Sequence, residues 1–158
     1  MTIAMRVLAA ALVLMALIFG ANACPEVGSQ AVHTVSVAGP VHSFTAFVDA
    51  GGTERLSGCD LAGLGELSGY VKPGADFRLV FAPPGGTGAT FRVSNMECDE
   101  FALVHTPNGV WHYVAAMIGA GSGSVRLTNP PSGDYSVWIG TLGNDECDSR
   151  LSVDRLGD

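Results

Sequence analysis

Short apolar or alternating segments recur along the chain beyond residue 30, and turn-forming residues separate them. The segments 77–81, 135–139 and 150–153 alternate with period two, so each would turn one apolar face toward a core. No stretch has the apolar spacing of an amphipathic helix. We therefore expect strands at His33–Val37, Phe44–Val48, Leu67–Val71, Phe77–Phe81, Thr90–Val93, Phe101–His105, Val110–Val114, Val125–Leu127, Tyr135–Ile139 and Arg150–Val153.

Glycine, proline and asparagine mark the turns between these segments. Gly51-Gly52 and Pro73-Gly74 are typical, because proline fixes φ and glycine accepts positive φ. Pro107-Asn108-Gly109 joins two segments closely enough to form a β-hairpin with Asn-Gly at its tip. About 8–10 short strands separated by frequent turns predict an all-β protein, an antiparallel β-sandwich of the jelly-roll-like kind.

Residues 1–23 have the features of a secretory signal helix that is removed after export. A short segment with one basic residue, Arg6, precedes an apolar run from Val7 to Phe19, and Ala21-Asn22-Ala23 supplies the small residues that signal peptidase recognises. The run is shorter than the roughly 20 residues needed to span a bilayer, so we expect no transmembrane segment. The expected organisation is a signal peptide over 1–23 and a single domain over 24–158, either periplasmic or secreted.

Cys24 leaves one alternative open. A cysteine directly after the cleavage site is also the position at which bacterial lipoproteins are lipidated, so a lipid-anchored envelope lipoprotein is an alternative. The box Ala21-Asn22-Ala23-Cys24 lacks the usual leucine at its first position. Lipidation would also leave one of the remaining cysteines without a partner. We therefore prefer ordinary cleavage before Cys24.

Charge and cysteine content narrow the class of protein further. The chain has 15 acidic and eight basic residues and a net charge of −7, which disfavours binding to nucleic acid. Its four cysteines all follow residue 23, and an even number in an exported domain predicts two disulfides. Three pairings are possible, and our hypothesis is Cys24–Cys59 with Cys98–Cys147. Zinc is a weaker alternative, because the chain has no Cys-x-x-Cys motif.

A series of motifs in the second half resembles a known family. Cys98-Asp99-Glu100 precedes an apolar segment, residues 105–111 (HTPNGVW) form the expected hairpin, and residues 134–141 (DYSVWIGT) form a strand with a central tryptophan. Together they resemble bacterial exported domains related to the pre-peptidase C-terminal (PPC-like) β-sandwich, over about residues 50–156. The resemblance implies a non-catalytic domain that accompanies secreted proteases or other exported enzymes. Relatives often carry an Asp-Asp pair where this chain has Ala115-Ala116.

The sequence contains no recognised catalytic motif. No serine lies in Gly-x-Ser-x-Gly, and the even number of cysteines argues against a reactive thiol. His105 and His112 flank the expected hairpin and could face each other across it, but one pair of histidines supplies too few ligands for zinc or copper. We therefore expect no enzymatic activity and no cofactor other than a possible Ca²⁺.

Two groups of residues are candidates for binding. The first is an acidic rim that a Cys98–Cys147 bond would bring together, with oxygen ligands of the kind that Ca²⁺ prefers. Its members are Glu97, Asp99, Glu100, Asp145, Glu146 and Asp148. The alternative is that these carboxylates point separately into water. The second group is Trp111 and Trp138, either of which could stack on a ligand, although packing in the core is the more ordinary role of a tryptophan.

These observations predict a monomeric, exported, non-catalytic binding or structural domain. Its expected partner is another exported protein or a cell-envelope glycan. The alternative from a different class is a small secreted hydrolase, associated with peptidases, whose site the sequence does not reveal.

Overall fold

The computed structural model describes residues 24–37, 43–81, 88–94, 97–117 and 121–156, so the expected signal peptide over 1–23 lies outside the described residues. The elements in these ranges are all β-strands, which confirms the all-β prediction. They are β1 (His33–Val37), β2 (Ser43–Ala50), β3 (Glu54–Arg55), β4 (Tyr70–Val71), β5 (Phe77–Phe81), β6 (Gly88–Ser94), β7 (Glu100–His105), β8 (Trp111–Ala116), β9 (Gly123–Thr128), β10 (Gly133–Thr141) and β11 (Cys147–Leu156).

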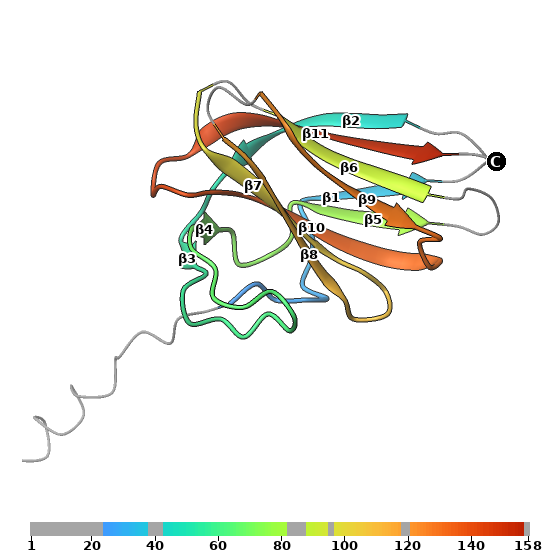
Figure 1. Ribbon diagram of the computed structural model, residues 1–158, viewed down its shortest axis with the longest axis horizontal. Helices are drawn as coiled ribbons and strands as arrows, with labels where there is room; N and C mark the ends of the chain where they lie inside the picture. The colour runs from blue at the N-terminus through green and yellow to red at the C-terminus, as the bar shows by residue number, and fades with distance from the viewer. Residues whose placement is uncertain (1–23, 38–42, 82–87, 95–96, 118–120, 157–158) are drawn as a thin grey trace, which may run out of the picture.

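The strands form two sheets that face each other as a sandwich (Figure 1). In sheet A, the central strand β10 pairs with β7 on one side and with β5 and β4 on the other. The outer strands are β8, which pairs with β7, β1, which pairs with β5, and β3, which pairs with β4. Sheet B has the order β2-β11-β6-β9. Almost all neighbours are antiparallel, as expected, but β1 runs parallel to β5. Within the described part of the chain, no helix is long and apolar enough to span a membrane.

The main core lies between the two sheets. Alternating strands turn residues such as Phe77, Phe91 and Leu151 inward, and all three are fully buried. Tyr135 belongs to the same core, and its hydroxyl donates a hydrogen bond of 2.7 Å to the Pro131 carbonyl. Burial raises the pKa of this phenol to about 12. The period-two pattern of the sequence therefore becomes a closed, two-layer core.

A second apolar cluster lies on the outer side of sheet A, and it requires a cover. Residues 24–32 and 56–69, which we call the cover, pack against the outward side chains of β7, β8 and β10. Figure 1 shows both segments together beyond sheet A, on the side away from β2 and β11. Leu56 and Leu61 of the cover are buried, and Cys24 is bonded to Cys59 with a Cα–Cα distance of 5.6 Å.

The cover explains one departure from the predicted strands and the burial of Trp138. The expected strand Leu67–Val71 is reduced to Tyr70–Val71, because Leu67 packs against the apolar cluster as part of the cover. On β10 the Tyr135 side chain and those that follow it on the same face are buried, whereas the opposite face carries exposed Asp134 and half-buried Ser136 beside Trp138. Trp138 is fully buried, since the cover closes the outer face as sheet B closes the inner one. Sequence analysis also missed β3, which has only two residues.

A buried carboxylate next to the start of β5 links this strand to β10. Asp76 is inaccessible to solvent and accepts hydrogen bonds of 2.8 Å from the Ile139 backbone N–H and from Lys72 Nζ. Burial raises the pKa of Asp76, while these two donors lower it. Lys72 also donates to the Asp49 carbonyl in β2, so the network reaches sheet B. The arrangement fixes the start of β5 against β10.

Candidate functional site

The two sheets bring several acidic residues to one end of the sandwich. Cys98 is bonded to Cys147, with a Cα–Cα distance of 6.5 Å, so both disulfides have the hypothesised pairing. Beside this bond lies an acidic depression of about 340 Å³. Its lining residues are Asp49, Glu97, Glu146, Cys147 and Asp148. Three of the six expected rim carboxylates therefore share one depression, whereas Asp99 and Asp145 are not part of its lining.

Asp49 is a member of this depression that sequence analysis missed. The register of β2 and β11 places Asp49 directly opposite Asp148, although the two residues are 99 positions apart. Like charges opposite each other on one sheet face destabilise the pair. The only sequence signal for Asp49 was its polar position in an alternating segment, which does not identify the partner strand.

Glu100 is not on the open rim, which corrects the expectation that it forms part of a solvent-accessible site. Its side chain is fully buried, because β7 begins beneath the Cys98–Cys147 bond. Its carboxylate and the two sulfur atoms all lie within 4.8 Å of one another. Within the part of the chain that the structure describes, neither carboxylate oxygen completes a hydrogen bond, although the Ser149 hydroxyl is close enough to favour the charged form. Burial is the larger effect and raises the pKa of Glu100.

The two tryptophans lie side by side, with ring centroids 5.4 Å apart. Trp138 is inaccessible, and among the described residues its indole N–H has no hydrogen-bond partner, so the hypothesis that it stacks on a ligand is wrong for the folded domain. Trp111 is half-buried and its ring also contacts His105 at 4.7 Å. His105 lies opposite Trp111 in the hairpin rather than opposite His112, because His112 pairs with Val104. The two histidines therefore do not form a metal-binding pair across the strands.

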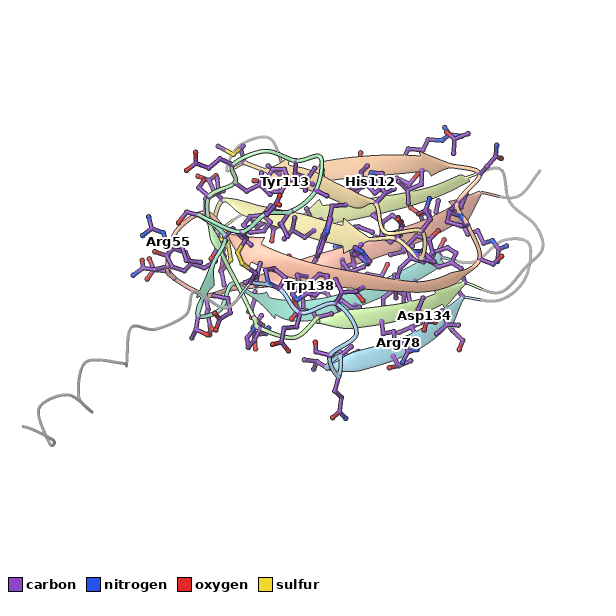
Figure 2. The ribbon with its side chains drawn as sticks, turned by 90° about the horizontal axis from the view of Figure 1, so that it is seen from below. Arg55, Arg78, His112, Tyr113, Asp134 and Trp138 are labelled. Atoms are coloured by element: carbon purple, nitrogen blue, oxygen red, sulfur yellow. A yellow bond between two sulfur atoms is a disulfide. The ribbon has the colours of Figure 1, made fainter. Side chains whose placement is uncertain are left out.

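A further depression lies on sheet A at the edge of the cover. A row of side chains crosses the sheet there, since His105 is opposite Ser136 and Ser136 is opposite Arg78. With Asp134 these residues line a polar depression of about 520 Å³, bounded by residues 27–29 and Pro107. Figure 2 shows Arg78 and Asp134 close together on neighbouring strands, where they form an ion pair. We refer to this as the polar depression.

Serine, histidine and aspartate meet in the polar depression, but they are not arranged as a catalytic triad. Such a triad requires the histidine to bond both the serine and the acid. Here Asp134 pairs with Arg78, the His105 ring contacts Trp111, and within the described residues no hydrogen bond joins His105 to Ser136. Burial lowers the pKa of His105, so its imidazole is neutral near pH 7. The site presents donors and acceptors to a polar ligand without an activated nucleophile.

The outer face of sheet B differs from that of sheet A, because its outward side chains are polar and exposed. Along β2, the outward positions alternate with inward apolar ones, and Phe47 is the exception with 76% of its surface exposed. Arg92, Arg126 and Arg150 are exposed on the three neighbouring strands of this face. We call this surface the open face; sequence analysis did not identify it.

Comparisons with known proteins add little to this description. No family of known proteins and no curated protein matches the chain. Among solved structures, the chain is similar to PliG of Aeromonas hydrophila, a periplasmic lysozyme inhibitor of g-type lysozyme. The two share 13% sequence identity, over 77% of this chain and 94% of that one, with a TM-score of 0.38. The PPC-like resemblance noted from the sequence stays a prediction.

Proposed function

We propose that this chain is an exported, non-catalytic domain that binds a polar ligand in the polar depression of sheet A. The expected signal peptide and the two disulfides support export, because disulfides persist in oxidising compartments. The expected partner is a cell-envelope glycan or another exported protein. A lipid anchor at Cys24 does not fit this proposal, since that sulfur is bonded to Cys59.

The observation that supports binding over catalysis is the pairing of side chains in the depression. A hydrolase would need Asp134 to orient His105, yet the Arg78 guanidinium holds Asp134 instead. The half-buried His105 and Ser136 have hydrogen-bonding capacity that a ligand can use. A concave site with a few convergent polar groups is the usual form of a small-ligand pocket.

The test compares wild type with a variant in which the depression is filled. Ser136→Trp would occupy the space beside His105 and Arg78, and Thr53→Trp would add the same side chain at an exposed turn as a control. Oligosaccharides and short peptides would be screened by thermal shift. We expect ligands that stabilise wild type and Thr53→Trp but leave Ser136→Trp unchanged.

Hydrolytic activity provides the opposing outcome. Wild type, His105→Ala and Ser136→Ala would be assayed with ester, peptide and glycoside substrates. We expect no turnover that depends on these residues. Turnover that both substitutions abolish would establish the secreted hydrolase and overturn the proposal.

A second candidate function is the binding of a divalent cation at the acidic depression. It is favoured by Glu100, a fully buried carboxylate that completes no hydrogen bond and lies against the cystine bordering the depression. Together with the carboxylates at the surface it makes this end of the domain rich in oxygen ligands, which suit Ca²⁺. Asp49, Glu97, Glu146 and Asp148 line the depression, and their carboxylates would be the ligands of the ion.

Thermal melting tests the cation proposal. A ligand that binds only the folded state at a hundred times its Kd raises stability by about 2.7 kcal/mol. We expect millimolar Ca²⁺ to raise Tm by several degrees over EDTA at matched ionic strength, and Glu146→Gln to abolish the rise. Asp60→Asn, in a separate depression, should preserve it. An equal rise in matched sodium chloride would indicate screening alone.

A further inference from the structure

The pairing registers of sheet B place three arginines in one line on the open face. Arg150 of β11 is opposite Ser94 of β6, and Arg92 lies two residues before Ser94 on that same strand. Arg92 is in turn opposite Ser124 of β9, and Arg126 lies two residues after Ser124. Diagonal neighbours on one sheet face are roughly 7–8 Å apart. The three arginines therefore occupy diagonal positions across three neighbouring strands.

This line gathers three basic residues on one sheet face of an acidic protein, and three aspartates, Asp49, Asp148 and Asp154, have outward positions on the same face toward the ends of β2 and β11. Only seven basic residues follow residue 23, and the open face carries three of them. Arg92 is 3.9 Å from Asp154, whereas Arg126 and Arg150 have no ion pair within the described residues. The Arg150 Nε donates instead to the Ser94 hydroxyl at 3.3 Å. Arg78 and Lys72, in contrast, are each paired with a carboxylate on sheet A.

The other residues of the open face are more typical of a surface that binds a flexible polar polymer than of one that binds another protein. Phe47 is directly opposite Arg150 and is highly exposed, so a ring could stack on it beside a guanidinium. The neighbouring outward positions are mostly hydroxyl residues, such as Thr45, Ser124 and Ser152. Protein interfaces usually have several apolar anchors surrounded by other contacts, and this face has one.

We propose that the open face binds an anionic polysaccharide, with Phe47 stacking on a sugar ring and the arginine line binding acidic groups along the polymer. Guanidinium groups bind carboxylate, sulfate and phosphate through paired hydrogen bonds. The polymer's repeated charges match a linear array better than a single anion would. The site is on the opposite sheet from the polar depression, so either site can be present without the other.

Binding to defined polymers tests this inference. The mature domain would be titrated with polygalacturonate as the anionic polysaccharide and with dextran as the neutral control, at about 50 and 200 mM salt. We expect binding to polygalacturonate that weakens with salt, because counterions are released from the polyanion, and no comparable binding to dextran. A single-stranded oligonucleotide and anionic phospholipid vesicles would be measured alongside.

Single substitutions locate the site. Arg126→Ser and Arg150→Ser should each weaken binding to polygalacturonate at least about threefold and reduce its salt dependence. Arg55→Ser is the matched control, since Arg55 is an exposed arginine on β3 of sheet A, and it should change affinity less than about twofold. Phe47→Ser should also weaken binding, whereas Val32→Ser, at another exposed apolar position, should not.

Each remaining outcome would overturn the inference. Equal affinity for dextran and polygalacturonate would show that charge is not recognised. If Arg55→Ser lost as much affinity for polygalacturonate as Arg126→Ser and Arg150→Ser, the effect of charge would be diffuse and would not locate a site. Absence of binding at 50 mM salt, or tighter binding to the oligonucleotide or the vesicles, would exclude an anionic polysaccharide as the ligand. None of these results would affect the thermal-shift test of the polar depression.

Discussion

The Cys24–Cys59 bond should contribute a large part of the stability of the domain. Replacing both cysteines, as Cys24→Ser with Cys59→Ser, removes the bond without leaving a free thiol. The bond joins residues 35 positions apart, and for a loop of that length the chain-entropy model gives about 4 kcal/mol. Domains of this size are stable by only about 5–15 kcal/mol, so we expect Tm to fall by roughly 10–15 °C.

The structure indicates where this loss will be detected first. The bond fastens the two segments of the cover to each other over Trp138 and its apolar neighbours. Urea unfolding would be followed by tryptophan fluorescence, which reports on Trp111 and Trp138 beside the cover, and by far-ultraviolet circular dichroism, which reports on both sheets. If the cover opens separately in the variant, the fluorescence transition will precede the dichroism transition.

The control is the second bond. Cys98→Ser with Cys147→Ser opens a loop of separation 49, for which the same model gives a slightly larger cost. That variant should unfold with coincident probes, because this bond joins the loop before β7 of sheet A to the start of β11 of sheet B. A loss below about 1 kcal/mol for the Cys24–Cys59 pair would show that apolar packing alone holds the cover, and would refute the reasoning.

Two further predictions follow from individual contacts, and a third follows from the sequence of the N-terminus. Asp76→Ala should lower the free energy of unfolding in urea by about 3 kcal/mol, because it leaves Lys72 and the Ile139 N–H without their buried acceptor. Asp134→Ala is the control, since it removes an exposed ion pair and should lower the free energy of unfolding by less than about 1 kcal/mol. Tyr135→Phe should cost about 1 kcal/mol at pH 7. Because burial raises the Tyr135 pKa from 10.0 to about 12, the phenol ionises in the unfolded state before it does in the folded state, and the free energy of unfolding of wild type falls between these pH values. Tyr135→Phe has no phenol to ionise, so its free energy of unfolding should fall less over the same range. An identical alkaline pH profile in wild type and variant would contradict this explanation. N-terminal sequencing of the exported protein should begin at Cys24, and a blocked, lipid-modified terminus would establish the lipoprotein instead.

The fold could be predicted largely from the sequence because most of its strands alternate with period two. The segment around Phe77 illustrates this, since its inward positions are buried and Arg78 is exposed. The cover could not be predicted, because residues 56–69 have no regular period and acquire their role only by packing on another element. Leu67 was therefore assigned to a strand, and ligand stacking was considered for Trp138, which the cover buries.

The candidate sites depend on long-range pairing, which local patterns do not encode. The Cys98–Cys147 hypothesis correctly brought Glu97, Glu146 and Asp148 together, since they lie next to the cysteines in sequence. It could not supply Asp49, which reaches the site through the register of β2 with β11. It also placed Glu100 on the rim, because a local pattern does not show that β7 begins beneath the cystine.

The two outer faces provide different kinds of information about function. On β7 the outward residues Phe101 and Leu103 are apolar, so sheet A folds only with a cover, and stability explains the residues found there. Sheet B alternates regularly and buries its apolar residues against the main core, so its outward positions face water in any case. The main core does not require arginine at 92, 126 or 150, although Arg92 pairs with Asp154 and Arg150 donates to Ser94 across the sheet. The alignment of three of the few basic residues on this face therefore calls for a functional explanation, and an anionic ligand provides one.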